Sequence, residues 1–320
     1  MKSIRIYGLY PLLGIAVPMI CAGVLSAQVR QAPLPPGEMP AALCSTLRED
    51  YTSFAQCHSA TQAEMCAMAQ LATEDKTQAH RFDAIMGESD PDKAIRLVEN
   101  FVNSYPKSSL LSYAYFFAAS AYQKKGNIEQ TAEYAGKSLK LDPDNLMSLI
   151  LSVEVLPQPQ YLKKHAFDGA NILRQAQNEA GHALQLIPQI LKESQESDAD
   201  YQKRLAALAS EVHGALGTVH MELASGGPGG FDKAELAKAE QELQIAVSTT
   251  RSPDPRDYYR LGEAYGVEGK FDDAIQAFTK AGKLGQDTAI KAYSSQQIAQ
   301  LKKRKAQGLA AANRAAASGH

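Results

Sequence analysis

The sequence predicts an all-α protein built as a solenoid of stacked helix–turn–helix repeats. Its 320 residues are rich in Ala, Leu, Gln, Glu and Lys and contain no Trp. Runs of β-branched residues are scarce, which favours helix nearly throughout. Two segments, 109–145 and 255–288, share one spacing of large and small residues around a glycine turn. A pattern that recurs in this way indicates stacked helical pairs rather than two average domains.

The first 27 residues have the features of an export signal. Lys2 and Arg5 form a basic start, Ile6–Leu25 is apolar, and Leu25-Ser26-Ala27 offers a small-residue cleavage site. The apolar run is also about as long as a membrane span requires, so an uncleaved anchor is the alternative. We expect residues 1–27 to be a cleaved signal peptide and the mature chain to be periplasmic or secreted. Membrane contact is expected only if the leader is retained.

Two further segments are expected to precede the repeats. Residues 28–40 are rich in Pro and polar residues and predict a disordered linker. Residues 41–73 show loose helical spacing and are expected to form an N-terminal helical cap. This cap contains Cys44, Cys57 and Cys66, an odd number that allows one disulfide of unknown pairing and leaves one thiol. A fully reduced, buried set of cysteines is the alternative, and the spacings match no familiar zinc site.

The clearest repeat lies at 257–281. The first helix of this repeat has Tyr258, Leu261, Gly262 and Tyr265, and Gly269 forms the turn. The second helix has Phe271, Ala274, Phe278 and Ala281. Small residues fall where two antiparallel helices must approach closely, and large residues fall where gaps must be filled. The segment resembles one unit of the tetratricopeptide repeat (TPR) family, a helix–turn–helix repeat of about 34 residues. The resemblance implies a right-handed α-solenoid that binds other chains and has no chemistry of its own.

A second clear unit lies at 109–145. The first helix of this unit has Tyr115, Ala118, Ala119 and Tyr122, and Gly126 and Ile128 form the turn. The second helix has Thr131, Ala135 and Ser138. Pro143 then ends the second helix, because Pro cannot continue a helix.

Three weaker copies of the pattern lie at about 78–106, 149–188 and 213–246. Asp90 is expected to cap a helix in the first of these. The other two carry inserts between their helices, with PQPQ at 157–160 and GGPGG at 226–230. Such inserts usually emerge as loops on one face of a solenoid.

The solenoid is therefore expected to span 74–288 with about five repeats. A C-terminal helix at 289–305 is expected to cover its last apolar face. The remaining residues, 306–320, are Ala- and Gly-rich and are expected to be disordered.

No motif of catalysis or metal binding occurs in the sequence. The GGPGG insert lacks the Lys-Ser/Thr ending of a phosphate-binding loop, and Asp232 after it is expected to cap a helix together with Glu235. His213 and His220 lie at positions normally held by packed aromatic residues. We therefore expect neither an enzyme nor a cofactor or metal ion. The alternative is a metal- or ligand-binding protein or enzyme with its site in the cysteine region or the inserts.

The resemblance also implies a binding groove on the first helices. The positions that face it in the family correspond here to Tyr113, Phe116, Ser120, Gln123 and Lys124, and to Arg256, Tyr259, Glu263, Gly266 and Val267. Family members that clamp a C-terminal carboxylate use Lys and Asn at two of these positions. At these two positions the unit at 109–145 has Phe116 and Ser120, and the unit at 255–288 has Tyr259 and Glu263. No such clamp is therefore expected.

An aromatic, weakly charged groove suits a partner segment with apolar anchors. The alternative is that these rings pack against neighbouring repeats. Acidic residues outnumber basic ones, 35 to 33, which does not favour nucleic acid as a partner. The predicted function is a non-enzymatic scaffold or assembly factor of the bacterial cell envelope that binds proteins or peptides.

Overall fold

The computed structural model describes residues 76–190, 192, 196–225, 231–286 and 288–317. The predicted signal peptide, linker, cysteine-containing cap and GGPGG insert lie outside these residues. The described part of the chain is helical throughout, apart from short connections, and has no strand. None of its helices is long and apolar enough to cross a membrane.

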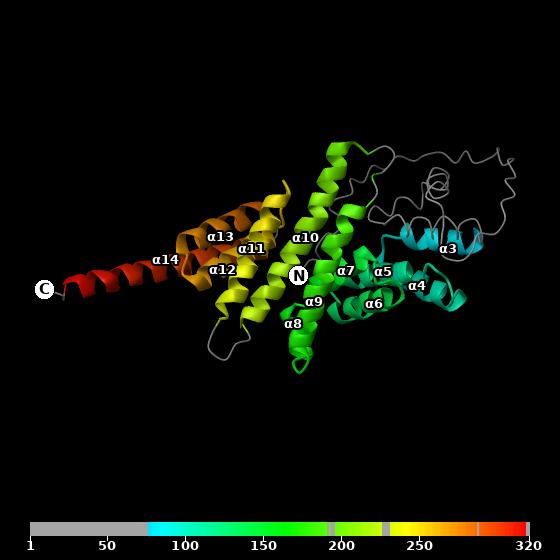
Figure 1. Ribbon diagram of the computed structural model, residues 1–320, viewed down its shortest axis with the longest axis horizontal. Coiled ribbons are helices and arrows are strands. Elements are labelled where there is room, and N and C mark those ends of the chain that lie inside the picture. Colours follow the sequence, from blue (N-terminus) through cyan, green and yellow to red (C-terminus); the bar gives the residue numbers. More distant parts are fainter. Residues whose placement is uncertain (1–75, 191, 193–195, 226–230, 287, 318–320) are drawn as a thin grey trace.

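The helices follow one another along an elongated array, with α3 near one end and α14 at the other (Figure 1). Their bounds are α3 (Lys76–Met86), α4 (Pro91–Ser104), α5 (Leu111–Lys124), α6 (Ile128–Leu141), α7 (Leu146–Val155), α8 (Pro159–Lys164), α9 (Gly169–Leu186), the 3₁₀ helix η2 (Ile187–Gln189), α10 (Asp198–Ser225), α11 (Lys233–Thr249), α12 (Pro255–Glu268), α13 (Phe271–Leu284) and α14 (Thr288–Ala317).

The helices form two layers. In the first layer α3, α5, α7, α10, α12 and α14 each contact the next in that order. The second layer contains α4, α6, α9, α11 and α13, and each packs against first-layer helices on its two sides. This alternation of first and second helices is that of an α-solenoid, as the sequence predicts.

The two clear units turn at glycines, as expected. Gly126 follows α5 with φ 71°, and Gly269 follows α12 with φ 80°. Both lie in the left-handed region that glycine adopts without a steric penalty. Asn127 then caps α6 by accepting a hydrogen bond from the Gln130 amide at 3.2 Å. The turn is therefore specified by local residue chemistry.

Small residues lie where the two layers touch. A Cβ added to Gly262 would lie 3.0 Å from ring atoms of Phe278, and one added to Gly217 would lie 2.5 Å from Leu243 Cγ. Ala135 and Ala274 are fully buried at corresponding contacts. These positions confirm that helix approach limits side-chain size in the repeats.

A buried polar cluster joins the unit at 109–145 to the next one. Asn145 caps α7 by accepting from the Ser148 amide at 3.0 Å, and it donates to Ser112 Oγ at 3.1 Å. Ser138 Oγ lies 3.0 Å from Ser112 Oγ and accepts from Ser148 Oγ at 2.7 Å. All four residues are at most 3% exposed. Because every one of them has a partner, this junction is held by hydrogen bonds as well as by apolar contacts.

The structure differs from the sequence-based expectation at two places. The PQPQ insert is partly helical, because Pro159 begins α8, where its fixed φ suits the first turn. The expected disordered tail is wrong for most of its length, since α14 continues past Lys305 to Ala317. Alanine has the highest helix propensity of the residues, and this outweighs the glycine in the segment.

Candidate functional site

A continuous line of polar side chains crosses the first layer from α5 to α12. The Gln123 amide of α5 donates to a Glu154 carboxyl oxygen of α7 at 2.7 Å. The carboxyl group of Glu211 on α10 lies near that of Glu154, and each affects the pKa of the other. Arg256 at the start of α12 acts on both carboxyls through its charge. We call this feature the polar strip, and it consists of Gln123, Glu154, Glu211, Asp254, Arg256 and Asp257.

The start of α12 positions the guanidinium of the polar strip. Asp254 is the N-cap, and its carboxylate accepts from the Arg256 amide at 2.8 Å. The Arg256 side chain folds back onto the same carboxylate, with Nε at 3.0 and 2.9 Å from its two oxygens. Burial alone would raise the pKa of Asp254, but the hydrogen bonds and charge of Arg256 outweigh it and hold that pKa below its usual value. This fork-like pair is therefore ionised and fixed in place.

The remaining carboxyls of the polar strip have raised pKa values. Burial raises the pKa of Glu154, and the charge of Arg256 offsets part of the effect. Burial also raises the pKa of Glu211 well above its usual value, and the neighbouring Glu154 raises it further. The pKa of Asp257 rises to about 7, because burial outweighs the attraction of Arg260, whose Nη1 lies 3.6 Å away. At neutral pH the polar strip therefore carries less negative charge than its number of carboxyls suggests.

Gly214 of α10 makes room for Asp257. A Cβ at this position would lie 2.5 Å from Oδ1 of the Asp257 carboxyl. Asp257 is 5% exposed, so it cannot move into solvent without separating α10 from α12. No sequence motif marks Asp257, and the one signal of its buried place is this glycine at the facing position of α10.

The polar strip continues toward the C-terminus. Glu222 of α10 and Glu263 of α12 both have pKa values raised by burial and partly lowered by Arg260. Burial raises the pKa of Tyr259, and Glu263 and Gln297 of α14 lie close enough to affect that pKa as well. Polar contacts thus extend over every first-layer helix from α5 to α14.

The predicted groove residues of the unit at 109–145 are only partly accessible. Tyr113 and Ser120 are 8% and 4% exposed, so neither offers its side chain to a partner. Phe116 is half-buried against Phe117, at a centroid distance of 5.1 Å. Lys124 is half-buried. Partner binding by Phe116 and Lys124 stays a prediction.

The predicted groove residues of the unit at 255–288 belong to the polar strip and its continuation. Arg256 is held by Asp254, and Glu263 contacts Tyr259. The Tyr259 ring packs edge-on against Phe278 of the same unit, with centroids 5.1 Å apart. Carboxyls and a guanidinium thus lie beside Tyr259 on this face, and partner binding by Arg256, Tyr259 and Glu263 stays a prediction.

Both predicted packing histidines bridge α10 to α11. His213 Nδ1 lies 2.6 Å from a Glu242 oxygen, and His220 Nδ1 lies 2.6 Å from a Glu235 oxygen. Asp232 caps α11 as predicted, accepting from the Glu235 amide at 3.2 Å. These pairs connect the helices of one unit. Across the described ranges, no three His, Cys, Asp or Glu side chains are grouped so that they could hold a metal ion.

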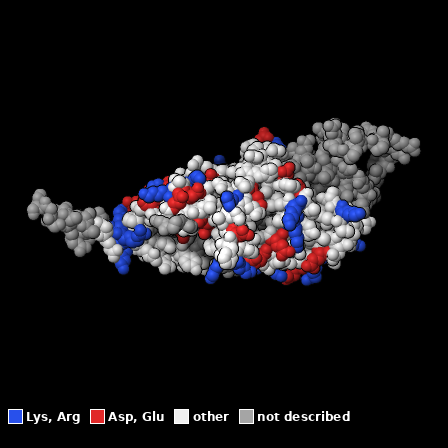
Figure 2. Space-filling view, turned by 60° about the horizontal axis from the view of Figure 1, so that its bottom comes forward, with Lys and Arg blue, Asp and Glu red and all other residues white. Residues whose placement is uncertain are grey.

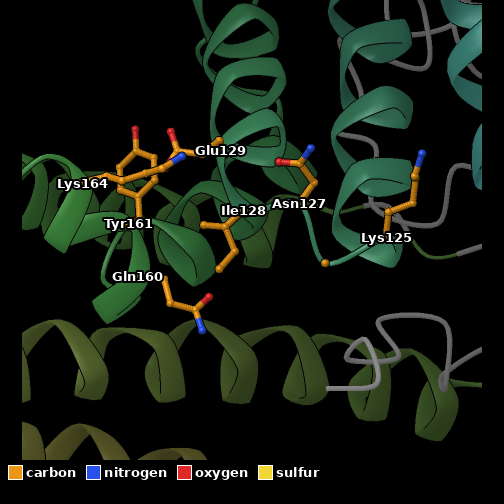
Figure 3. A pocket seen from close by; sticks show the side chains of 8 residues that line it. Lys125, Asn127, Ile128, Glu129, Gln160, Tyr161 and Lys164 are labelled. Carbon is orange, nitrogen blue, oxygen red and sulfur yellow. The ribbon is translucent and has the colours of Figure 1, made fainter.

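A shallow pocket of about 400 Å³ lies between the α5–α6 turn and the insert helix α8 (Figure 3). Its charged groups already have partners: Lys125 pairs with Asp92, and Lys164 lies 3.4 Å from Glu129. Asn127 is engaged as the cap of α6. The pocket therefore presents satisfied polar groups, and the polar strip is the stronger candidate site.

Acidic and basic side chains are interspersed on the face that Figure 2 shows. A run of four basic residues, Lys302-Lys303-Arg304-Lys305, lies in the middle of α14. Lys305 pairs with Asp272, and Arg304 lies over the Phe271 ring. These contacts attach α14 to α13 rather than forming a separate basic surface.

The two clear units match a known family. The family model described as tetratricopeptide repeat matches residues 112–145 and 258–284. No curated protein is significantly similar to the chain in sequence. The chain thus contains two segments of TPR type within a longer helical array.

Similar solved structures include two whose descriptions name TPR domains or proteins. A thermophilic TPR protein from Thermus thermophilus is 19% identical, with a TM-score of 0.45, 65% of this chain covered and 90% of that one. MamA, as an RS-1 ArsTM double mutant, is 15% identical, with a TM-score of 0.37, 65% of this chain covered and 93% of that one. The TPR2AB domain of yeast Sti1, in a complex with pHSP90, is 14% identical, with a TM-score of 0.24, 82% of this chain covered and 98% of that one.

Proposed function

We propose that this chain, an α-solenoid whose two clear units are tetratricopeptide repeats, is a scaffold that binds a segment of a partner protein along its first layer. The polar strip is the observation that supports this proposal. Carboxyls with raised pKa values destabilise the fold when they ionise, and proteins tend to keep such groups at functional sites.

The chemistry of the polar strip favours a polar partner segment. Glu154 and Glu211 are hydrogen-bond acceptors when ionised, whereas Arg256 is already engaged by Asp254 and Asp257 is buried between α10 and α12. A segment that presents Lys or Arg side chains, or free backbone amides, would supply donors to these carboxyls. We therefore expect partner binding to weaken as salt is raised, because exposed charge pairs are screened.

We further propose that the protein acts outside the cytoplasm, as a scaffold or assembly factor of a bacterial cell envelope. The support is the basic start, apolar run and cleavage site of residues 1–27. N-terminal sequencing of the mature protein tests it, with Gln28 expected as the first residue. A mature chain that begins at Met1 and is found in the cytoplasm would contradict it.

Site-specific photo-cross-linking in envelope extract tests the binding surface. Val267 of α12 and Leu284 of α13 are 39% and 49% exposed, and they lie on the first and second layers. A photoreactive residue at Val267 is expected to cross-link one reproducible partner, less so at high salt, and a photoreactive residue at Leu284 is expected not to do so. Equal cross-linking of that partner at both positions would contradict binding along the first layer.

A further inference from the structure

The C-terminal helix α14 carries an unbalanced positive charge. Residues 288–320 contain six basic and no acidic residues, whereas residues 76–287 contain 23 basic and 29 acidic ones. The two parts therefore have opposite net charges at neutral pH. Because α14 lies at one end of the elongated array, these charges are separated along the long axis of the molecule (Figure 1). A negatively charged surface would attract the α14 end and repel the rest of the array.

The first part of α14 packs on the array, and the rest extends beyond it. Leu301 is 4% exposed and belongs to one apolar cluster with Phe278 of α13. Further along, Lys305 Nζ lies 2.7 Å from Oδ2 of Asp272, the second residue of α13. Because α14 runs antiparallel to α13, its last 12 residues, 306–317, continue past the start of α13. This extension spans about 18 Å, so α14 is longer than the apolar face that it covers.

Most basic side chains of α14 have no carboxylate partner. Among the residues that the structure describes, the pair that Lys305 makes with α13 is the sole ion pair of this helix. Lys291, Lys302 and Lys303 are exposed. Lys291 and Lys302 are 11 residues apart, which is close to three turns, so they lie on the same side of the helix. Lys303 lies about 100° further round, nearly opposite the buried Leu301.

The residue types on this outward side favour an anionic bilayer over a protein partner. Lysine is depleted at the centres of protein–protein interfaces, where Tyr, Trp and Arg anchors dominate. Between the lysines the exposed residues are Gln296, Ala299 and Gln300, which offer no apolar anchor for a protein pocket. A lysine is a mobile point charge that needs no fixed partner geometry, and clusters of about four to eight basic residues on a helix bind anionic lipid headgroups. The export signal expected at residues 1–27 favours a membrane surface over nucleic acid.

We propose that the basic part of α14 docks the end of the solenoid onto an anionic phospholipid bilayer, whether or not residues 1–27 are retained. A lysine near an anionic membrane surface raises the affinity by a factor of about five. Lys302 and Lys303 together therefore contribute about 25-fold, and the contact weakens as salt is raised because the attraction is screened. Docking by this end leaves the polar strip, which lies on α5, α7, α10 and the start of α12, free for a partner segment.

Because the chain contains no Trp, a single introduced Trp reports on one site alone. Tyr293 of α14 is 56% exposed, and Phe167, in the loop between α8 and α9, is fully exposed. Energy transfer from Tyr293→Trp to a dansyl-labelled lipid is measured with the full chain and phosphatidylcholine vesicles, with or without about 30% phosphatidylglycerol. Transfer is expected with the anionic vesicles only and is expected to fall at high salt. Phe167→Trp is the control reporter and is expected to show much less transfer.

Charge removal on α14 is the decisive change. In the Tyr293→Trp protein, Lys302→Gln together with Lys303→Gln is expected to weaken vesicle binding about 25-fold, and the fold is expected to persist because both side chains are exposed. Lys107→Gln with Lys203→Gln removes the same charge at exposed sites away from α14 and is expected to change the affinity less than about twofold. Equal transfer with both vesicle types, equal transfer at both reporters, or an unchanged affinity of the α14 variant would overturn the proposal. So would binding of a short DNA duplex by the two lysines in place of the vesicles.

Discussion

Replacing Gly217 with alanine tests whether helix contact sets residue size in the repeats. The new methyl would lie 2.5 Å from Cγ and 2.9 Å from Cδ2 of Leu243. Leu243 is fully buried, so its side chain cannot swing away into solvent. Overpacking of this kind costs about 1–3 kcal/mol, against a gain in helix propensity of about 1 kcal/mol. We expect a net loss of up to about 2 kcal/mol in the free energy of unfolding.

Gly136→Ala in α6 is the matched control. No atom lies within 4 Å of the Cβ that it would add, so only the propensity gain remains. We expect this variant to be up to about 1 kcal/mol more stable than the wild type.

Urea unfolding followed by far-UV circular dichroism compares these variants, alone and in a Leu243→Ala background. That background should cost about 2–5 kcal/mol by itself, and it opens the space that the Gly217→Ala methyl needs. Gly217→Ala should therefore become neutral or stabilising there, a non-additive result. The reasoning is refuted if Gly217→Ala is as stable as Gly136→Ala, or if its effect is the same in both backgrounds.

Three further predictions concern single residues. Asp257→Asn should be more stable than the wild type above pH 7, and it should lose less stability between about pH 4 and about pH 7. The wild type loses about 4 kcal/mol of its free energy of unfolding over that range, because folding raises the pKa of Asp257 from 3.8 to about 7. Parallel pH profiles of the two proteins in urea unfolding would contradict this. Asn145→Ala should lower the free energy of unfolding by about 2–4 kcal/mol, because it removes a cap and leaves Ser112 without its donor; an unchanged urea midpoint would argue against it. Gly269→Ala should lower the free energy of unfolding by about 1–2 kcal/mol, because residue 269 has a φ of 80°, and Gly269→Asn should lower it less. Thermal unfolding compares the two variants, and equal stability would exclude a backbone cause.

The sequence predicts those parts of the fold that depend on local residue chemistry. Gly126 and Gly269 specify turns through their backbone freedom, and Asp90 and Asp232 cap the helices expected for them. These signals act within one helix pair, so they can be read from a short stretch of sequence. The two clear repeats follow from them.

The candidate site depends on contacts between units, which a single repeat does not encode. Glu154 and Glu211 lie in the two weak units, where inserts obscure the register of the pattern. Their contact depends on how α7 and α10 pack, and each carboxyl alone resembles an ordinary surface glutamate. Tyr259 occupies a groove position of the family, and its edge-on contact with Phe278 lies within one repeat.

The helix α8 has a practical consequence for protein engineering. It lies between α7 and α9, which still pack against each other, and the loop after it exposes Phe167 fully. The array thus accommodates extra chain between the two helices of a unit without separating its layers. A reporter peptide or epitope tag grafted between α8 and α9 should leave the core and the polar strip intact, which makes this loop the preferred place to label the protein.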